Sequence, residues 1–345
     1  MADHSTRVPT VSVLMPCFNV SQTLDETMRS LLEQTYPDFE IVAVDDGSTD
    51  QTREQLEMWA QKESRLRVAR IPHAGIIPAL NHGLDLCKAP LIARMDADDV
   101  AHPDRFLRQV ELLEHRSEIA AAGSLVEGFP AETLREGYKI YIDWLNRLVD
   151  PNAIAREIFI ESPLAHPSVM MRKSWLDKVG GYEERGWAED YDLWLRMHTA
   201  GAQFAKVPEI LLYWREHADR LTRTDSRYSV ENFLRAKSYY LAIGPLKNSA
   251  GVVIWGAGQM GRRISKHIER NGVHLKAFID IDPKKIGRTM RGCPIVARDQ
   301  LMSFVRDEEP TFVLAAVGSR GARVAIREYL SSIGLREGMD WWAVA

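Results

Sequence analysis

The length, composition and charge of the chain exclude several kinds of protein. With 345 residues, the chain is longer than one ordinary domain of roughly 100–200 residues, so we expect two domains. Hydrophobic residues make up 45% of the sequence, which is enough for a packed core. The formal net charge of −4 argues against a nucleic-acid partner, because proteins that bind nucleic acids usually carry an excess of basic residues.

The cysteines and the apolar segments indicate the cellular compartment of the protein. Cys17, Cys87 and Cys293 are far apart and match neither a disulfide framework nor a zinc site, as is typical of a reducing cytosol. The polar N-terminus carries no signal-peptide core, and the longest apolar runs are shorter than the roughly 20 residues of a transmembrane helix. We expect a cytoplasmic protein without a transmembrane segment, and leave open a peripheral contact with the inner face of the cell membrane.

The first half of the chain alternates predicted strands with predicted helices. The strands are expected at 11–15, where Pro16 would end the first of them, and at 39–44, 66–71 and 91–95. The helices between them are expected after an N-cap at Ser21 and at about 51–61 and 78–87. Strands that alternate with helices predict an α/β fold with a mostly parallel sheet and helices on both faces.

Two acidic clusters follow two of these strands directly. Asp45 and Asp46 come after the strand at 39–44, and Asp96, Asp98 and Asp99 come after the strand at 91–95. Open α/β sheets bind their ligands in the crevice beyond the carboxyl ends of the strands. The sequence therefore predicts an acidic pocket at this edge of the sheet.

The middle of the chain is less regular. It contains a predicted helix whose aromatic residues, Tyr138, Tyr141 and Trp144, are spaced three apart. Such a stripe stacks on sugars in some proteins and contacts membranes in others, but we expect it to pack in the core. Around 241–250 the turn residues Gly244 and Pro245 predict a boundary between a first domain, 1–245, and a second, 246–345.

The second domain starts a new series of strands and helices. Strands are expected at 252–255, 275–279 and 311–317, and helices at 262–270 and 322–330. A glycine-rich turn formed by Gly256, Gly258 and Gly261 lies between the first strand and helix, and Asp280 ends the next strand. This context predicts a Rossmann-like domain, in which the glycines would permit the close approach of a pyrophosphate and Asp280 could bind ribose hydroxyls.

The acidic loop at 96–98 suits a particular chemistry. A sugar nucleotide leaves as a nucleoside diphosphate, and Mg²⁺ or Mn²⁺ stabilises the negative charge of that leaving group. Such cations are held by few carboxylates together with phosphates and waters. Two carboxylates on one short loop fit this need, although an isolated Asp-x-Asp sequence is more often a solvated loop.

Five segments in the same order resemble glycosyltransferase family 2, the inverting enzymes with the GT-A fold. They are VSVLMPCFN at 11–19, VDDGSTD at 44–50, ARMDADD at 93–99, HPSVM at 166–170 and AEDYDLW at 188–194. The resemblance covers about residues 8–230. It implies transfer of a sugar from a nucleotide diphosphate donor, by analogy a UDP-sugar, to a hydroxyl of a glycan or lipid-linked acceptor in cell-surface glycan synthesis.

The resemblance also implies roles for the matched residues. Phe18 would lie against the base, and Asp46 would accept a hydrogen bond from a uracil-like ring. Asp96 would contact the ribose or the metal ion, and Asp98 would coordinate the metal. Asp190 would be the catalytic base.

An inverting transfer independently needs a base, because the acceptor hydroxyl loses its proton as it attacks the anomeric carbon. Glu189 is the competing assignment, and the helix dipole alone favours an acidic pair at the start of a helix. We expect Asp192 to be structural.

The segment YWREH at 213–217 resembles the part of related enzymes that closes over the diphosphate. His217 would complete the metal shell, and Arg215 or Arg223 would contact phosphate; the alternative is a surface histidine beside ordinary arginines. The Gln-x-x-Arg-Trp signature and the membrane helices of processive synthases are missing, which favours transfer of one sugar per encounter.

The second domain keeps other interpretations open. The segment 278–287 resembles small Rossmann-like domains attached to sugar-nucleotide-modifying enzymes, which bind a nucleotide or mediate assembly into oligomers. A nicotinamide cofactor, NAD(P), would fit its glycine turn, but without a catalytic Tyr-x-x-x-Lys pair we do not expect redox turnover. The alternatives to a transferase are a nicotinamide-dependent sugar-nucleotide oxidoreductase or epimerase, and a non-catalytic sugar-nucleotide-binding protein.

Overall fold

The computed structural model describes residues 8–218, 220–305, 310–319 and 321–345. The chain forms two compact units that do not follow chain order. The first unit contains residues 1–154, 163–185 and 200–223, and the second contains 155–162, 186–199 and 224–345. The predicted domains, 1–245 and 246–345, were placed where the sequence pattern changes. The compact units are defined by contacts between residues and are discontinuous in sequence, so the predicted domain boundary stays a prediction.

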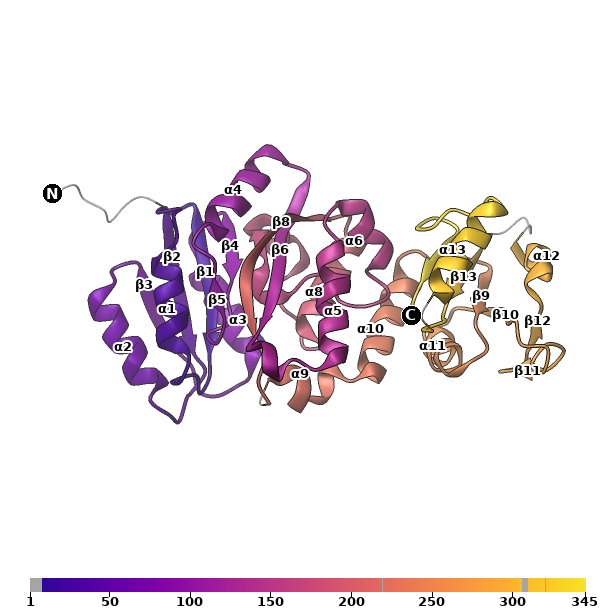
Figure 1. Cartoon of the computed structure of the whole chain (residues 1–345), viewed down its shortest axis with the longest axis horizontal. Coiled ribbons are helices and arrows are strands. Elements are labelled where there is room, and N and C mark those ends of the chain that lie inside the picture. Colours follow the sequence, from indigo (N-terminus) through magenta and orange to yellow (C-terminus); the bar gives the residue numbers. More distant parts are fainter. Residues whose placement is uncertain (1–7, 219, 306–309, 320) are drawn as a thin grey trace. The chain divides into compact units, whose positions relative to one another are not determined.

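An eight-stranded sheet forms the first unit, in the order β3-β2-β1-β4-β7-β6-β8-β5. Pairing is parallel from β3 to β4 and between β6 and β8, whereas β7 and β5 run antiparallel to their neighbours. The strands are β1 (Val11–Cys17), β2 (Phe39–Asp45), β3 (Leu66–Arg70), β4 (Leu91–Arg94), β5 (Val100–Ala101), β6 (Ile119–Phe129), β7 (Met170–Arg172) and β8 (Gln203–Arg215) (Figure 1). The predicted α/β fold with a mostly parallel sheet is therefore confirmed.

Helices cover both faces of this sheet because successive strand residues point to opposite sides. Val13 and Met15 of β1 pack in one core cluster with Met28 of α1, whereas Leu14 faces α3, where a Cβ added to Gly83 would lie 2.4 Å from the Leu14 Cδ1 atom. The helices are α1 (Leu24–Leu32), α2 (Thr52–Lys62), α3 (Ile76–Leu86), α4 (Arg105–His115), α5 (Glu136–Arg147) and α7 (Lys173–Val179). Two further helices, α6 (Pro151–Glu157) and α9 (Leu221–Thr224), cross between the two units along the chain.

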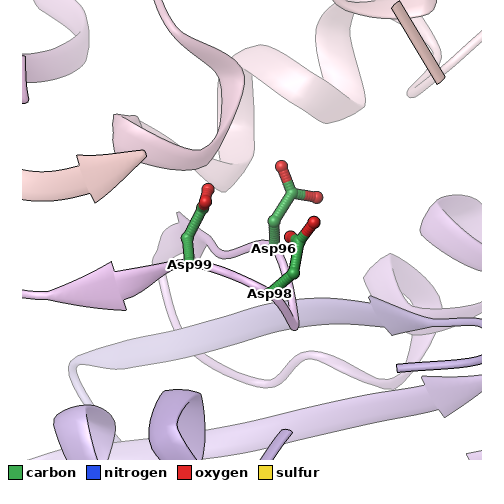
Figure 2. A group of neighbouring side chains, drawn as sticks. All are labelled: Asp96, Asp98 and Asp99. Atoms are coloured by element: carbon green, nitrogen blue, oxygen red, sulfur yellow. The ribbon is translucent and has the colours of Figure 1, made fainter. Parts of the chain in front are cut away.

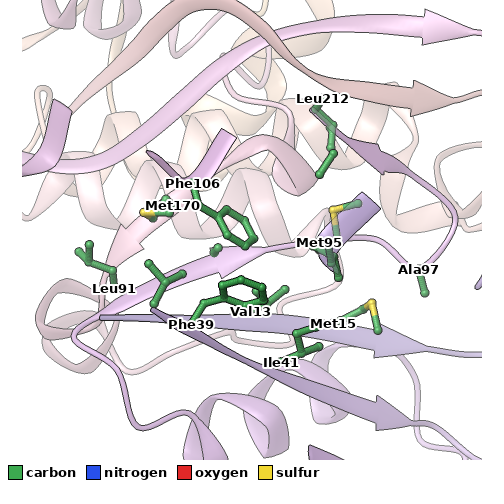
Figure 3. Close-up of a cluster of buried hydrophobic side chains, with 14 of the residues drawn as sticks. Val13, Met15, Phe39, Ile41, Leu91, Met95, Ala97, Phe106, Met170 and Leu212 are labelled. Carbon is green, nitrogen blue, oxygen red and sulfur yellow. The ribbon is translucent and has the colours of Figure 1, made fainter. Parts of the chain in front are cut away.

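The loop between β4 and β5 carries Asp96, Asp98 and Asp99 at the carboxyl end of β4 (Figure 2). Below it, the buried side chains of the parallel strands meet those of α4 and β7. Phe39 and Phe106 pack edge to face with ring centroids 5.3 Å apart, and Met95 and Met170 lie in the same cluster (Figure 3). The acidic loop is thus held on a well-packed base.

Two local predictions for the first unit were wrong. Pro16 does not end β1, which continues to Cys17. Beyond Leu14 the strand pairs only with β2, and a proline is tolerated where one side of a strand is unpaired. Ser21 does not cap α1, which begins at Leu24 with Thr23 as its N-cap; Ser21 lies in the preceding loop, where its backbone N–H donates to Asp50 at 3.1 Å.

The aromatic stripe lies on α5, as predicted, and packs against the core of the first unit. Tyr138, Tyr141 and Trp144 are partly buried against the main core cluster. The rings of Tyr138 and Tyr141 contact Trp214 of β8, with centroids 5.5 and 6.4 Å apart. The predicted core role of the stripe is confirmed.

The second unit contains a six-stranded sheet in the order β11-β12-β10-β9-β13-β14. Its strands are β9 (Gly251–Trp255), β10 (Leu275–Ile279), β11 (Thr289–Met290), β12 (Cys293–Val296), β13 (Thr311–Ala315) and β14 (Trp341–Ala343), all parallel except β11. Its helices are α8 (Glu189–Thr199), α10 (Val230–Ile243), α11 (Gln259–Arg270), α12 (Met302–Val305) and α13 (Ala322–Ser332). Parallel strands joined by helices confirm the Rossmann-like arrangement.

Among the described residues, no helix combines the length and the apolar character needed to cross a membrane.

The turn between β9 and α11 needs a glycine at position 261 but not at position 258. A Cβ at Gly261 would lie 1.8 Å from the Gly256 carbonyl oxygen, whereas a Cβ at Gly258 would meet nothing within 4 Å. We therefore expect Gly261→Ala to lower the free energy of unfolding by about 1–3 kcal/mol through overpacking. Gly258→Ala is the matched control and should unfold at the wild-type denaturant concentration. Equal unfolding midpoints for the two variants would contradict this packing.

Candidate active site

Three carboxylates converge at the end of β4. One oxygen from each of Asp96, Asp98 and Asp99 lies within 4.8 Å of the others, and Figure 2 shows the three side chains projecting from one loop to the same side. Asp99 is 1% exposed, and its Oδ2 atom is buried without a hydrogen-bond partner in the described part of the chain. A buried carboxylate oxygen without a protein partner needs a cation, a proton or a water molecule.

The electrostatics of this cluster point to a cation. Burial raises the pKa of Asp99 well above its ordinary value, and the charges of Asp98 and Asp96 raise it further. Burial also raises the pKa of Asp96, even though Arg94 opposes the shift. For Asp98, burial acts in the same direction but is outweighed by His217, which holds the pKa of Asp98 below its ordinary value. Full ionisation of all three is costly unless a bound cation compensates it.

The end of β8 brings two predicted residues to this loop. The His217 Nε2 atom lies 2.9 Å from Asp98 Oδ2. Arg215 donates from Nε to the Asp98 carbonyl at 2.6 Å and from its backbone N–H to Asp99 Oδ1 at 2.8 Å. The carboxylate oxygens of this loop are ligands that suit Mn²⁺ or Mg²⁺, so the residues present fit such an ion.

Arg215 is tied down by more than the aspartate loop. Its guanidinium also pairs with Glu26 of α1 and lies 4.4 Å from the ring centroid of Phe129. The guanidinium thus makes three contacts within the protein and the backbone N–H a fourth, so Arg215 holds the end of β8 against the β4–β5 loop.

Arg220 is a site residue that the sequence interpretation missed. Its guanidinium lies 4.5 Å from the Trp214 ring centroid, donates to the Tyr138 hydroxyl at 2.6 Å and pairs with Glu216 at 3.1 Å. Burial would lower the pKa of Arg220, but Tyr138, Asp99 and Glu216 raise it above its ordinary value. Glu216 also pairs with Arg223, so one carboxylate orients two cations.

A second part of the site lies at the ends of β1 and β2. Phe18 is 42% exposed, and its ring stacks on His73 with centroids 4.1 Å apart. Asp46 is buried and accepts hydrogen bonds from the backbone N–H groups of Ala74 at 2.8 Å and Gly75 at 2.9 Å. The predicted pair Phe18 and Asp46 is thus joined by the turn that precedes α3.

This turn, too, was missed from the sequence. His73 Nδ1 lies 2.9 Å from Asp46 Oδ2, and Gly75 adopts a φ of +95° that favours glycine. The available signal was its position after β3, because the turn follows the third parallel strand at the same edge of the sheet.

The predicted base residues lie in the second unit, at the first turn of α8. Glu189 is 2% exposed, and its two carboxylate oxygens lie 2.9 and 2.7 Å from the hydroxyl of Tyr228, which donates to them. Asp190 is half-buried, and its Oδ1 atom accepts a hydrogen bond from the Tyr191 backbone N–H at 2.7 Å. Glu189 is therefore enclosed by a protein contact, whereas Asp190 is the more accessible carboxylate of the pair.

Asp192 holds the helix in place. It is fully buried and accepts hydrogen bonds from Trp187 Nε1 at 2.8 Å and from the Tyr240 hydroxyl at 2.7 Å. It also pairs with Arg196 at 2.7 Å. These contacts are those of a structural residue that fixes the direction of α8.

The predicted residues of the C-terminal turn lie together in the second unit. Gly256 directly follows β9, Gly258 is the N-cap of α11, and Gly261 lies in the first turn of that helix. The Asp280 carboxylate accepts hydrogen bonds from the backbone N–H groups of Ala257 and Asp282, each at 2.9 Å, and Lys285 Nζ lies 2.9 Å from Asp280 Oδ2. Asp280 thus stabilises the glycine turn itself.

Comparisons with known families match the two parts of the chain separately. Residues 12–180 match the family described as Glycosyl transferase family 2. Residues 247–333 match the family described as CoA binding domain.

Similar proteins are found among bacterial glycosyltransferases. An uncharacterized glycosyltransferase of Haemophilus influenzae is 30% identical over 79% of this chain and 84% of its own length. The putative glycosyltransferase EpsE of Bacillus subtilis is 31% identical over 79% of this chain and 95% of its own. Among solved structures, S. aureus TarS 1–349 in complex with UDP-GlcNAc has a TM-score of 0.57 at 18% identity, covering 76% of this chain and 72% of that chain.

The similarity to TarS supports the GT-A fold of the first unit. The regions matched by this chain cover most of the length of the two relatives. The chain therefore belongs to glycosyltransferase family 2 and is a glycosyltransferase.

Proposed function

We propose that this protein is an inverting, metal-dependent glycosyltransferase that moves a sugar from a UDP-sugar to an acceptor hydroxyl. The observation that carries the proposal is the cluster of Asp96, Asp98 and Asp99, with His217 2.9 Å from Asp98. When bound, Mn²⁺ or Mg²⁺ would neutralise charge on the departing diphosphate. Asp98 and His217 would hold the ion, with Asp96 at the ion or the ribose.

Other residues of the first unit would bind and orient the donor. The half-exposed ring of Phe18, stacked on His73, offers a flat apolar surface for a base. Asp46 would hold the turn at 73–75 beside that surface and accept a hydrogen bond from the base. Arg220 and Arg223, both oriented by Glu216, offer guanidinium groups suited to phosphate oxygens.

Asp190 is the proposed base that accepts the proton of the acceptor hydroxyl. The competing residue, Glu189, already accepts a hydrogen bond from Tyr228 at 2.7 Å and is almost fully buried. A base must reach the hydroxyl that it deprotonates, so the more accessible Asp190 is favoured.

The names of related proteins support the donor and acceptor classes. A relative in Escherichia coli, 25% identical over 70% of this chain and 83% of its own, is named UDP-Gal:alpha-D-GlcNAc-diphosphoundecaprenol beta-1,3-galactosyltransferase. Other relatives are named for amylovoran biosynthesis and O-antigen biosynthesis. We accordingly propose a UDP-sugar donor and a glycan or lipid-linked acceptor in cell-surface glycan synthesis, with peripheral contact at the inner face of the membrane.

The role of Asp98 is tested by Asp98→Ala. Because one ligand of the ion is removed, we expect Mn²⁺-dependent release of UDP from UDP-sugars to fall by roughly 10²-fold or more. The release is measured with a panel of UDP-sugars, because the sugar is not known. No acceptor is added, so water takes the place of the acceptor hydroxyl. The control is Asp143→Ala, which removes an exposed carboxylate on α5 of the same unit. An Asp98→Ala enzyme as fast as the control would disprove the metal role.

The base assignment is tested by comparing Asp190→Asn with Glu189→Gln. Because the proton acceptor is lost, Asp190→Asn should release UDP from UDP-sugars about 10²–10⁴-fold more slowly than the wild type. Its affinity for UDP, measured by calorimetry with Mn²⁺, should stay at the wild-type value. Glu189→Gln should keep most of the activity, since the glutamine oxygen still accepts from Tyr228. The reverse order of the two rates would assign the base to Glu189.

A further inference from the structure

His73 makes both of the contacts that are proposed for the nucleobase of the donor. Its imidazole ring stacks on the Phe18 ring, with centroids 4.1 Å apart and an angle of 18° between the two planes. Its Nδ1 atom lies 2.9 Å from Asp46 Oδ2 and 3.1 Å from the Asp46 carbonyl oxygen. Both of these oxygens are acceptors, so Nδ1 carries a proton and donates it. A uracil ring that stacks on Phe18 and donates its N3–H to Asp46 would make the same pair of contacts.

The Asp46 carboxylate is enclosed by the turn at 73–75. Its Oδ1 atom accepts from the Ala74 backbone N–H at 2.8 Å, and its Oδ2 atom accepts from the Gly75 backbone N–H at 2.9 Å as well as from His73. Only 4% of the Asp46 side chain is exposed. The two backbone donors belong to the turn itself, so the His73 side chain is the partner that an incoming nucleobase can replace.

The geometry places the nucleobase and the His73 ring in the same space. Because the His73 ring touches both Phe18 and Asp46, these two contacts meet on one side of the Phe18 ring. A nucleobase on the opposite face of Phe18 would stack, but it would leave the Asp46 carboxylate bonded to His73. Imidazole and uracil are both flat single rings, so one can replace the other against Phe18.

The backbone of His73 is held in place, whereas its side chain has room to turn. A Cβ added to Gly47 would lie 2.6 Å from the His73 backbone nitrogen, so the two segments are in close contact, and Gly47 adopts a φ of +68° that favours glycine. The His73 side chain, in contrast, is 56% exposed. Rotation about its χ1 bond would carry the ring into solvent and clear the nucleobase position without moving the turn.

We infer that His73 is a gate at the donor site. In the donor-free protein its ring occupies the position of the nucleobase, and the donor binds when this ring rotates away. The inference rests on the proposed role of Phe18 and Asp46 in binding the nucleobase of a UDP-sugar. It adds a regulation of that site, because only molecules with the ring rotated away bind the donor, and the apparent affinity is reduced by their fraction. The stack and the hydrogen bond of His73 keep that fraction small.

His73→Ala tests the gate on the full-length protein. The variant removes the ring and its hydrogen bond but keeps the backbone donors of the turn, so we expect UDP to bind about tenfold more tightly than to the wild type. The measurement is isothermal titration calorimetry with UDP at saturating Mn²⁺. The matched control is His115→Ala, which removes an exposed histidine at the end of α4 and should leave the affinity unchanged.

His73→Gln is a second variant that keeps one of the two contacts. Its amide still donates to Asp46 but offers no ring to Phe18, so its affinity for UDP should lie between those of the wild type and His73→Ala. It also replaces His73→Ala as the test if that variant melts early. An affinity equal to or weaker than that of the wild type in both variants would overturn the gate. Failure of the wild type and both variants to bind UDP would instead reject the proposed UDP-sugar donor, and the gate with it.

Discussion

The repulsion among three aspartates at the end of one buried strand is the constraint around which the first unit is organised. Two unit charges 4 Å apart interact by roughly 4 kcal/mol at the effective dielectric near a protein surface, and Asp96, Asp98 and Asp99 approach within 4.8 Å. Arg94 pairs with Asp96 at 2.6 Å, and the end of β8 supplies Arg215 and His217. These contacts fix the loop but leave a carboxylate oxygen of Asp99 without a hydrogen-bond partner among the described residues. Such an arrangement is expected of a site that receives a cation with its substrate.

The same region shows why the fold was largely predictable from the sequence. The alternation of β-branched runs with helical spacing located β1 to β4 and the helices between them, because burial on both faces imposes that pattern. The two wrong predictions, at Ser21 and Pro16, concern the ends of elements, which depend on contacts with residues far away in the sequence. Ser21 lies in the loop before α1, where Asp50 accepts from its backbone N–H, and the helix begins only at Leu24; β1 passes through Pro16 because β4 has already ended beside it.

The site was predictable only in part, for a related reason. Asp96 and Asp98 carry their signal in the sequence, because their loop directly follows a predicted buried strand and is one of five segments that match the family in order. Arg220 does not, because its place depends on Tyr138, 82 residues away. His73 reaches Asp46 across 27 residues. The choice between Glu189 and Asp190 rests on Tyr228, 39 residues distant, a contact that no local pattern contains.

The central claim is that a divalent ion held by the β4–β5 loop is required for the donor bond to break. Its most direct test is the rate of UDP release from UDP-sugars after exhaustive chelation, followed by titration with Mn²⁺ or Mg²⁺. The account predicts that the rate falls to the uncatalysed background and returns in a saturable way as the ion is added. An enzyme that keeps its full rate without any divalent ion would contradict it.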